Sequence, residues 1–185
     1  RPANFSPGTP GRGATLVETR SGARALVVNA IGRVFMQPCD DPFAVIDREL
    51  NACPLREAAD AVVVDFHGEA TSEKQAVGYF CDGRASLVVG THTHVPTADA
   101  RLLPKGTAYQ SDAGMCGDYD SVIGMKKEIA MPRMIRKMPG DRLAPAEGEA
   151  TLCGVLVSTD DRSGKAVQVQ AVRQGGRLTP MPVPD

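Results

Sequence analysis

The chain has 185 residues, of which 42% are hydrophobic, and its formal net charge is -1 at pH 7. This length and composition are enough for one globular domain with a sizeable core, so residues 1–185 are expected to form a single domain. The balanced charge excludes the overall positive field that nucleic-acid and membrane-surface binders carry.

The chain lacks the features of a membrane or secreted protein. No apolar run approaches the roughly 18–20 residues that cross a bilayer, so no membrane association is predicted. The five cysteines are widely spaced and form no Cys-x-x-Cys pair, which argues against a disulfide framework or a zinc ribbon and favours a reducing cytoplasm. The first residue is Arg1 in a loop-like stretch. We therefore expect the chain to be the C-terminal portion of a longer protein.

A β-hairpin and a short helix are predicted first. Residues 14–19 and 23–29 flank a Ser-Gly turn and are predicted to be paired strands. Residues 32–36 are predicted to be a further extended segment. Asp41 then precedes a proline, which is typical of an N-cap followed by the first helical position. The sequence therefore predicts two antiparallel strands that lead into a helix.

Two strands ending in histidine follow. Residues 61–66 are a continuous β-branched run, typical of a strand buried on both faces of a parallel sheet, and His67 comes directly after it. A second such run at 86–89 leads into Gly-Thr-His-Thr-His, which contains His92 and His94. Open α/β sheets place their sites at the carboxyl ends of parallel strands, so both ends are candidate site positions.

The helix between these strands, and the rest of the chain, have weaker signals. Ser72 and Gln75 match a capping box, which predicts a helix that begins there and ends near Gly83. A helix is also predicted within 121–138, with a kink or a late start at Pro132. Two further hairpins and a frayed tail complete the prediction: 101–103 with 107–110, 152–158 with 166–172, and the tail at 180–185.

The chain has three histidines, His67, His92 and His94, and all of them follow apolar strands. A single histidine is more often a hydrogen-bonded core or loop residue, but three at neighbouring strand ends favour a common metal site. Imidazole binds borderline divalent metals through one nitrogen, and a His-x-His spacing at a strand end projects both rings to one side. Asp65 could orient one of these rings or pair locally, and the sequence leaves both interpretations open.

Other charged side chains have two interpretations. Glu69 could transfer protons beside His67, although a carboxylate just ahead of a helix more often interacts with the N-terminal amides of that helix. A basic cluster could steer phosphate esters, but a solvated helix face is the more common arrangement. The cluster comprises Lys126, Lys127, Arg133, Arg136 and Lys137.

Several strings together span nearly the whole chain: VDFHGEATSEK at 64–74, VGTHTHV at 89–95, GTAY at 106–109, SDAGM at 111–115, DSVIGM at 120–125 and PAEGE at 145–149. They resemble the YmdB-like family of calcineurin-like metallophosphoesterases. The opening RPANF with PGTPG is similar to the family segment just past its metal-binding Asn-His motif. The family usually has alanine where Gly68 stands, and Pro132 intrudes on the last helix.

The resemblance implies an αββα sandwich whose N-terminal strands are missing from this chain. It implies two divalent metal ions, of iron, manganese or zinc, and hydrolysis of phosphodiesters such as 2′,3′-cyclic nucleotides. By the family pattern, His67 and His92 serve one metal and His94 serves the other. The carboxylate and asparagine ligands and the acid histidine belong to upstream motifs, so the chain alone is expected to be inactive, and its catalytic residue stays unknown.

Two alternatives to the dinuclear phosphodiesterase remain. A mononuclear zinc hydrolase would use His67, His92 and His94 and leave a fourth position open for water. A regulatory or scaffold module would keep the fold without catalysis. Metal stoichiometry separates the two enzymes, because one tightly held ion with activity in this chain favours the zinc hydrolase. The sequence leaves the oligomeric state open, including a homo-oligomer.

Overall fold

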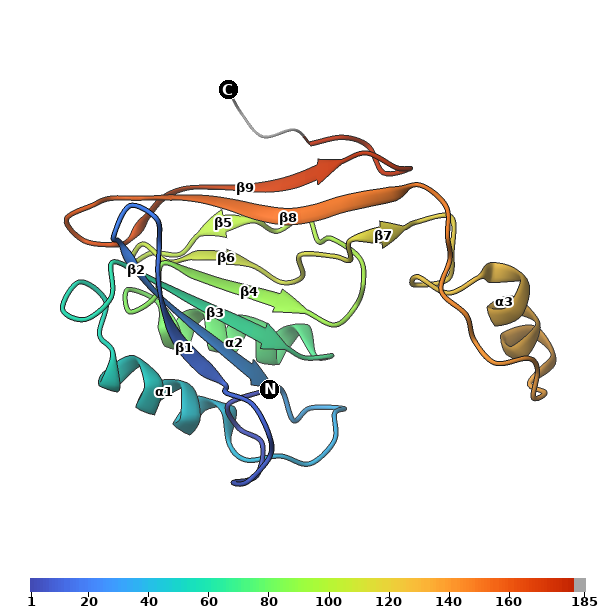
Figure 1. Ribbon diagram of the computed structural model, residues 1–185, viewed down its shortest axis with the longest axis horizontal. Coiled ribbons are helices and arrows are strands. Elements are labelled where there is room, and N and C mark those ends of the chain that lie inside the picture. The colour runs from blue at the N-terminus through green and yellow to red at the C-terminus, as the bar shows by residue number, and fades with distance from the viewer. Residues whose placement is uncertain (182–185) are drawn as a thin grey trace.

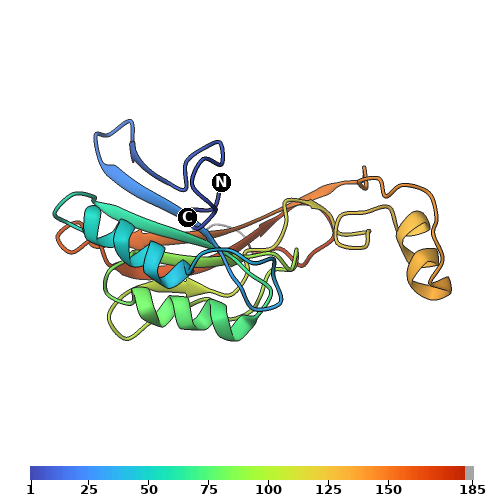
Figure 2. The same cartoon turned by 90° about the horizontal axis from the view of Figure 1, so that it is seen from below.

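The computed structural model describes residues 1–181, which form an α/β sandwich (Figure 1). A six-stranded sheet of order β1-β2-β3-β4-β6-β5 lies between helices α1 and α2 on one face and a three-stranded sheet of order β7-β8-β9 on the other. Helix α3 projects from one end (Figure 2). The bounds are β1 Ala14–Glu18, β2 Arg24–Ile31, α1 Pro42–Ala52, β3 Ala61–His67, α2 Thr71–Cys81, β4 Leu87–Thr91, β5 Arg101–Leu102, β6 Ala108–Gln110, β7 Gly117–Asp118, α3 Lys127–Arg136, β8 Ala150–Thr159 and β9 Ala166–Gln174.

The α/β class of the predicted αββα sandwich is confirmed, and the described residues form three of its layers, one of helices and two of strands. The larger core cluster, which includes Ile46, Leu50 and Val77, joins the two helices to the six-stranded sheet. A smaller cluster around Leu87 and Ala108 joins the two sheets. In the described part of the chain no helix is long and apolar enough to span a membrane. Of the predicted tail, residues 182–185 lie outside the described residues.

All three predicted hairpins are confirmed: β1 with β2, β5 with β6 and β8 with β9 are antiparallel pairs. The extended piece predicted at 32–36 is wrong, because this segment forms a turn. The carboxylate of Glu73 accepts hydrogen bonds from the backbone N–H groups of Arg33 and Val34, at 3.0 and 3.1 Å. These long-range bonds hold the segment as a loop against α2.

Helix α1 begins as predicted, with the Asp41 side chain accepting from the Phe43 N–H at 2.9 Å. The capping box predicted for α2 is wrong. The helix already begins at Thr71, so Ser72 lies inside its first turn, and its N-cap Ala70 has no side-chain hydrogen bond. The helix ends at Cys81, two residues before the predicted stop.

Helix α3 starts late in the predicted window and contains Pro132. Two side chains of the predicted basic cluster are paired at the start of this helix: Lys126, its N-cap, lies 2.9 Å from Glu147, and Lys127 lies 2.7 Å from Asp120. These two pairs are solvent-exposed and lie on a projecting helix, which favours the solvated face over a phosphate-steering patch.

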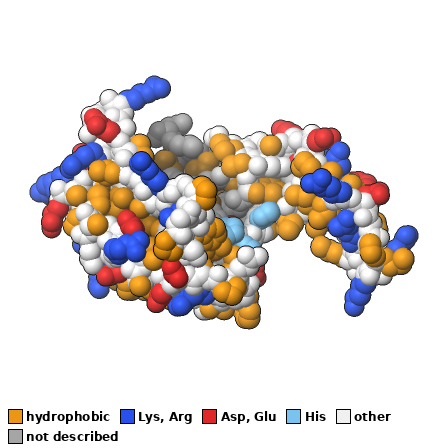
Figure 3. Space-filling model, turned by 60° about the horizontal axis from the view of Figure 1, so that its bottom comes forward, with side chains coloured by type: hydrophobic (Ala, Val, Ile, Leu, Met, Phe, Trp, Pro, Cys, Tyr) orange, Lys and Arg blue, Asp and Glu red, His pale blue; other side chains and the backbone are white. Residues whose placement is uncertain are grey.

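The parallel strands bring the predicted site positions to one edge. β2, β3 and β4 are parallel neighbours, and Ile31, His67 and Thr91 lie side by side in register. Since β3 ends at His67 and β4 ends at Thr91, the loops after both strands meet at this edge. Figure 3 shows histidine side chains in the hollow between the main body and the projecting segment.

Candidate metal centre

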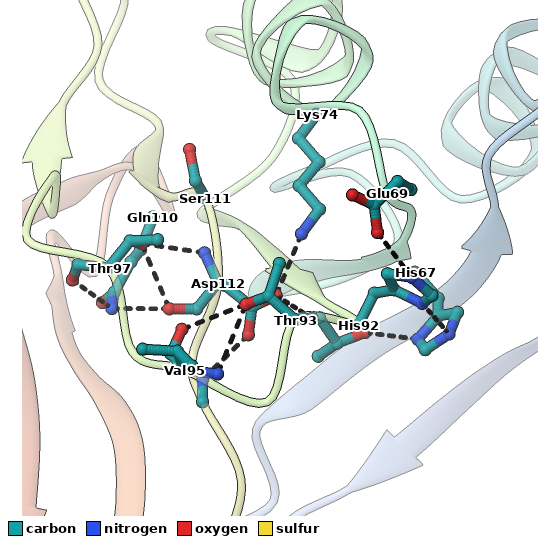
Figure 4. A network of polar contacts seen from close by, with 12 residues as sticks. His67, Glu69, Lys74, His92, Thr93, Val95, Thr97, Gln110, Ser111 and Asp112 are labelled. Carbon is teal, nitrogen blue, oxygen red and sulfur yellow. Dashed lines mark hydrogen bonds and ion pairs between the residues drawn. The ribbon is translucent and has the colours of Figure 1, made fainter. Parts of the chain in front are cut away.

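His67 and His92 lie in direct contact at the ends of β3 and β4 (Figure 4). Nε2 of His67 is 3.1 Å from Nδ1 of His92, and the two rings meet edge to face with centroids 4.9 Å apart. Burial lowers the pKa of His67 below its ordinary value, and the neighbouring His92 lowers it further. The His67 ring therefore favours its neutral form, which is the form that binds a metal.

The spacing of these two nitrogens fits two ligands of one ion. Metal–nitrogen bonds of about 2.1 Å with interligand angles near 90–110° place neighbouring nitrogens about 3.0–3.4 Å apart. The observed 3.1 Å separation lies within this interval. Within residues 1–181, however, no group of three or more His, Cys, Asp or Glu side chains is arranged to hold a metal ion. A complete site therefore requires ligands beyond this pair.

Glu69 contacts the other nitrogen of His92, a role that neither sequence interpretation foresaw. Its Oε2 lies 2.8 Å from Nε2 of His92, and its side chain is half exposed. A carboxylate accepts from Nε2–H and thereby leaves Nδ1, the nitrogen that faces His67, available as a ligand. The only sequence signal was position, two residues after His67 in a loop that turns toward the next strand end.

The third predicted ligand, His94, lies in the same loop as His92, but its ring contacts a different part of the chain. Nδ1 of His94 is 2.8 Å from the carbonyl oxygen of Ile123. The ring borders an open, largely apolar pocket of about 330 Å³, which Val95, Met115 and Tyr119 also line. The structure thus joins two of the three predicted ligands and places the third beside a pocket.

The loop that carries His92 and His94 has a strained backbone. Both residues have positive φ, 126° for His92 and 65° for His94, in a region that non-glycine residues rarely adopt. Such strain persists only where surrounding contacts over-determine the conformation, and it concentrates at functional sites. Here Asp112 accepts from the Thr93 N–H at 2.9 Å, and Tyr119 donates its hydroxyl proton to the His94 carbonyl at 3.1 Å.

A buried ion pair anchors this loop to α2. Nζ of Lys74 lies 2.9 Å from Asp112 Oδ2, and both side chains are at most 2% exposed (Figure 4). The other oxygen of Asp112 accepts from the Gly114 N–H at 2.9 Å. Burial alone raises the pKa of Asp112, but hydrogen bonds from Thr93, Lys74 and Gly114 outweigh it and leave the pKa below its ordinary value.

This lowered pKa predicts an acid-sensitive contribution to stability. The folded-state pKa of Asp112 lies below the unfolded-state value of about 3.9, so the unfolded chain binds more protons in this range. The contribution is complete above about pH 4 and is lost as pH falls through the folded-state pKa. We expect the urea midpoint to fall more steeply for the unmodified protein than for Asp112→Asn between about pH 4 and about pH 2. Parallel pH curves for the two proteins would contradict this assignment.

Taken together, the fold and the paired histidines at neighbouring strand ends are typical of a metal-dependent hydrolase. A family profile described as YmdB-like protein matches residues 1–172. The chain therefore belongs to the YmdB-like family, as the sequence motifs predicted.

Individual relatives agree with this assignment. A Bacillus subtilis (strain 168) protein named 2′,3′-cyclic-nucleotide 2′-phosphodiesterase is 49% identical over 172 residues, covering 93% of this chain and 64% of that protein. A crystal structure of a hypothetical protein from Thermus thermophilus matches with a TM-score of 0.86 and 44% identity, covering 96% of this chain and 67% of that one. A Mycoplasma pneumoniae structure described as a novel phosphatase matches with a TM-score of 0.82 and 33% identity, covering 95% and 63%. This chain thus spans about two thirds of the length of these relatives.

Proposed function

We propose that the full-length protein is a metal-dependent phosphodiesterase that hydrolyses 2′,3′-cyclic nucleotides, and that this chain supplies histidines to a two-metal site. The observation that carries the proposal is the 3.1 Å approach of His67 Nε2 to His92 Nδ1 at the ends of two parallel strands. The 49% identity to a protein named 2′,3′-cyclic-nucleotide 2′-phosphodiesterase supports the substrate class.

In this proposal His67 and His92 hold one ion, and His94 contributes to the second. Bound divalent ions, of manganese, iron or zinc, would supply Lewis-acid polarisation of the phosphoryl oxygens. The histidines are neutral donors, so carboxylate ligands are needed to offset the charge of two dications. We propose that these come from the part of the full-length protein that this chain does not span. The catalytic acid is placed there as well.

The residues of this chain have separate tasks in the proposed reaction. Glu69 holds the His92 ring through Nε2–H, and the Lys74–Asp112 pair fixes the loop between β4 and the pocket beside His94. Water attacks phosphorus, the P–O2′ bond breaks, and the released 2′ oxygen takes a proton, so that a 3′-monophosphate is the expected product. A small phosphodiester is thus the partner that we propose.

We also propose a cytoplasmic location. All five cysteines are free thiols, and two of them, Cys81 and Cys153, are buried. Free thiols persist in reducing compartments, whereas oxidising ones favour disulfides.

The proposed function is tested with the full-length protein after metal removal. We expect hydrolysis of 2′,3′-cyclic AMP to the 3′-monophosphate to return on addition of manganese, with little hydrolysis of 3′,5′-cyclic AMP under the same conditions. Product identity is read by chromatography against both monophosphate standards. Equal turnover in the metal-free and manganese-loaded protein would refute metal-dependent catalysis. Formation of the 2′-monophosphate would refute the bond assignment alone.

A further inference from the structure

A chain of hydrogen bonds runs from β2 to the His67 ring. Asn29 donates Nδ2–H to Asp65 Oδ2 at 2.8 Å, Thr91 donates its hydroxyl to Asp65 Oδ1 at 3.1 Å, and Nδ1 of His67 lies 3.0 Å from the Thr91 oxygen. The register explains the arrangement, because Asn29 lies opposite Asp65 on neighbouring strands and His67 lies opposite Thr91.

The donor and acceptor of each hydrogen bond in this series follow from the chemistry of the groups. An ionised carboxylate only accepts hydrogen bonds, so the single hydroxyl proton of Thr91 goes to Asp65. The Thr91 oxygen can then only accept from His67, and this requires a proton on Nδ1 of the ring. In the neutral imidazole the other nitrogen, Nε2, consequently carries a free lone pair. It is Nε2 that faces His92 at 3.1 Å.

The same logic applies to His94 by an independent route. The Ile123 carbonyl oxygen can only accept, so Nδ1 of His94 carries the proton and Nε2 is free. Ile123 has a φ of 47°, which is unfavourable for a β-branched residue. Reciprocal backbone bonds between Val122 and Met125, at 2.9 and 3.0 Å, hold the turn in this conformation. The strained turn therefore aims a carbonyl at the ring.

We propose that Thr91, and Asp65 acting through it, are positioning residues that fix His67 in the Nδ1–H tautomer and thereby make Nε2 its metal-binding nitrogen. The Ile123 carbonyl does the same for His94. The metal-binding consequence rests on the proposed function, whereas the tautomer assignment does not. Hydrogen-bond partners that set the tautomer of a ligand histidine typically change metal affinity by about 10- to 100-fold when they are removed.

The test uses the full-length protein and three substitutions at Thr91 and Asp65. Thr91→Val removes the acceptor at nearly constant shape, Thr91→Ser keeps the hydroxyl, and Asp65→Asn frees the Thr91 proton to donate toward the ring. Thr15→Val, on the exposed edge strand β1, is the matched control for the threonine-to-valine change. Urea unfolding identifies variants that do not fold, and Asp65→Asn replaces Thr91→Val as the test if the latter fails to fold.

The primary readout is the tautomer itself, from long-range ¹H–¹⁵N correlation of the imidazole nitrogens in metal-free protein, with the His67 signals assigned by His67→Gln. We expect Nδ1–H for His67 in the unmodified protein, Thr91→Ser and Thr15→Val, and a mixture of tautomers in Thr91→Val and Asp65→Asn. The second readout is manganese affinity, which should fall about 10- to 100-fold in Thr91→Val and change little in Thr91→Ser.

An Nε2–H tautomer in the unmodified protein would overturn the proposal, as would a Thr91→Val variant with unchanged tautomer and unchanged manganese affinity. These results are separable from failure of the proposed function. If the full-length protein binds no manganese and hydrolyses no cyclic nucleotide while His67 still shows Nδ1–H, the tautomer assignment is correct and the proposed metal-dependent function is wrong.

Discussion

Replacement of His92 by alanine in the full-length protein is expected to lower hydrolysis of 2′,3′-cyclic AMP by roughly three orders of magnitude, which corresponds to about 4 kcal/mol of transition-state stabilisation. The loss is expected to be large because of the position of His92 between two other site residues. His92 is the residue that contacts both His67 and Glu69, at 3.1 and 2.8 Å, so its loss removes a ligand and leaves both neighbours without their partner. The measurement is steady-state turnover at saturating manganese.

The control for this variant is Gln168→Ala, an exposed position on β9. It should keep the turnover of the unmodified protein. The fold of His92→Ala should also persist, because the His92 side chain is 30% exposed and outside the apolar core. If His92→Ala folds and retains near-normal turnover at saturating manganese, this residue does not belong to the site.

Replacement of Lys74 by methionine is expected to lower the free energy of unfolding by about 3–5 kcal/mol. Methionine preserves most of the aliphatic length but leaves Asp112 buried at 1% exposure without its counter-ion. Two backbone N–H groups, of Thr93 and Gly114, still bond to the carboxylate. They offset only part of the cost of an unpaired buried charge. The measurement is urea unfolding near neutral pH.

Lys126→Met is the matched control, because the Lys126–Glu147 pair has the same 2.9 Å separation but side chains that are 38% and 78% exposed. Solvent screening limits such a surface pair to about 0–1 kcal/mol. The double variant Lys74→Met with Asp112→Leu should recover part of the lost stability, since it removes both charges. Equal destabilisation by Lys74→Met and Lys126→Met would show that the buried pair has no special energetic weight.

Strands β3 and β4 were predictable because the sequence signals of a buried strand are local. Uninterrupted β-branched runs indicated β3 and β4, and a histidine at the end of each run indicated the edge where the site lies. The structure supplies the register of this parallel pair, which places His67 opposite Thr91. The family motifs supplied the chemistry that these patterns could not specify.

The interactions that tune the site were not predictable, because they join distant residues through unusual backbone conformations. Glu69 contacts His92, which lies in the loop after β4 and has a positive φ. The sequence predicts Lys74 to be an ordinary lysine on the helix surface, because lysine is almost never fully buried without a partner. Its partner Asp112 lies 38 residues away, so no local pattern indicated the buried pair. Glu73 lies between the two predicted capping residues, Ser72 and Gln75, and its carboxylate accepts hydrogen bonds from the backbone N–H groups of Arg33 and Val34, about 40 residues earlier in the sequence.

We propose that this chain holds the histidine half of a divided two-metal site. The most direct measurement compares residues 1–185 with the full-length protein, recording bound manganese per chain and turnover of 2′,3′-cyclic AMP in parallel. We expect two ions per chain with turnover in the full-length protein, and fewer ions with no appreciable turnover in residues 1–185. Comparable metal content and comparable rates in the two proteins would show that the complete catalytic set lies within residues 1–185, and would contradict a divided site.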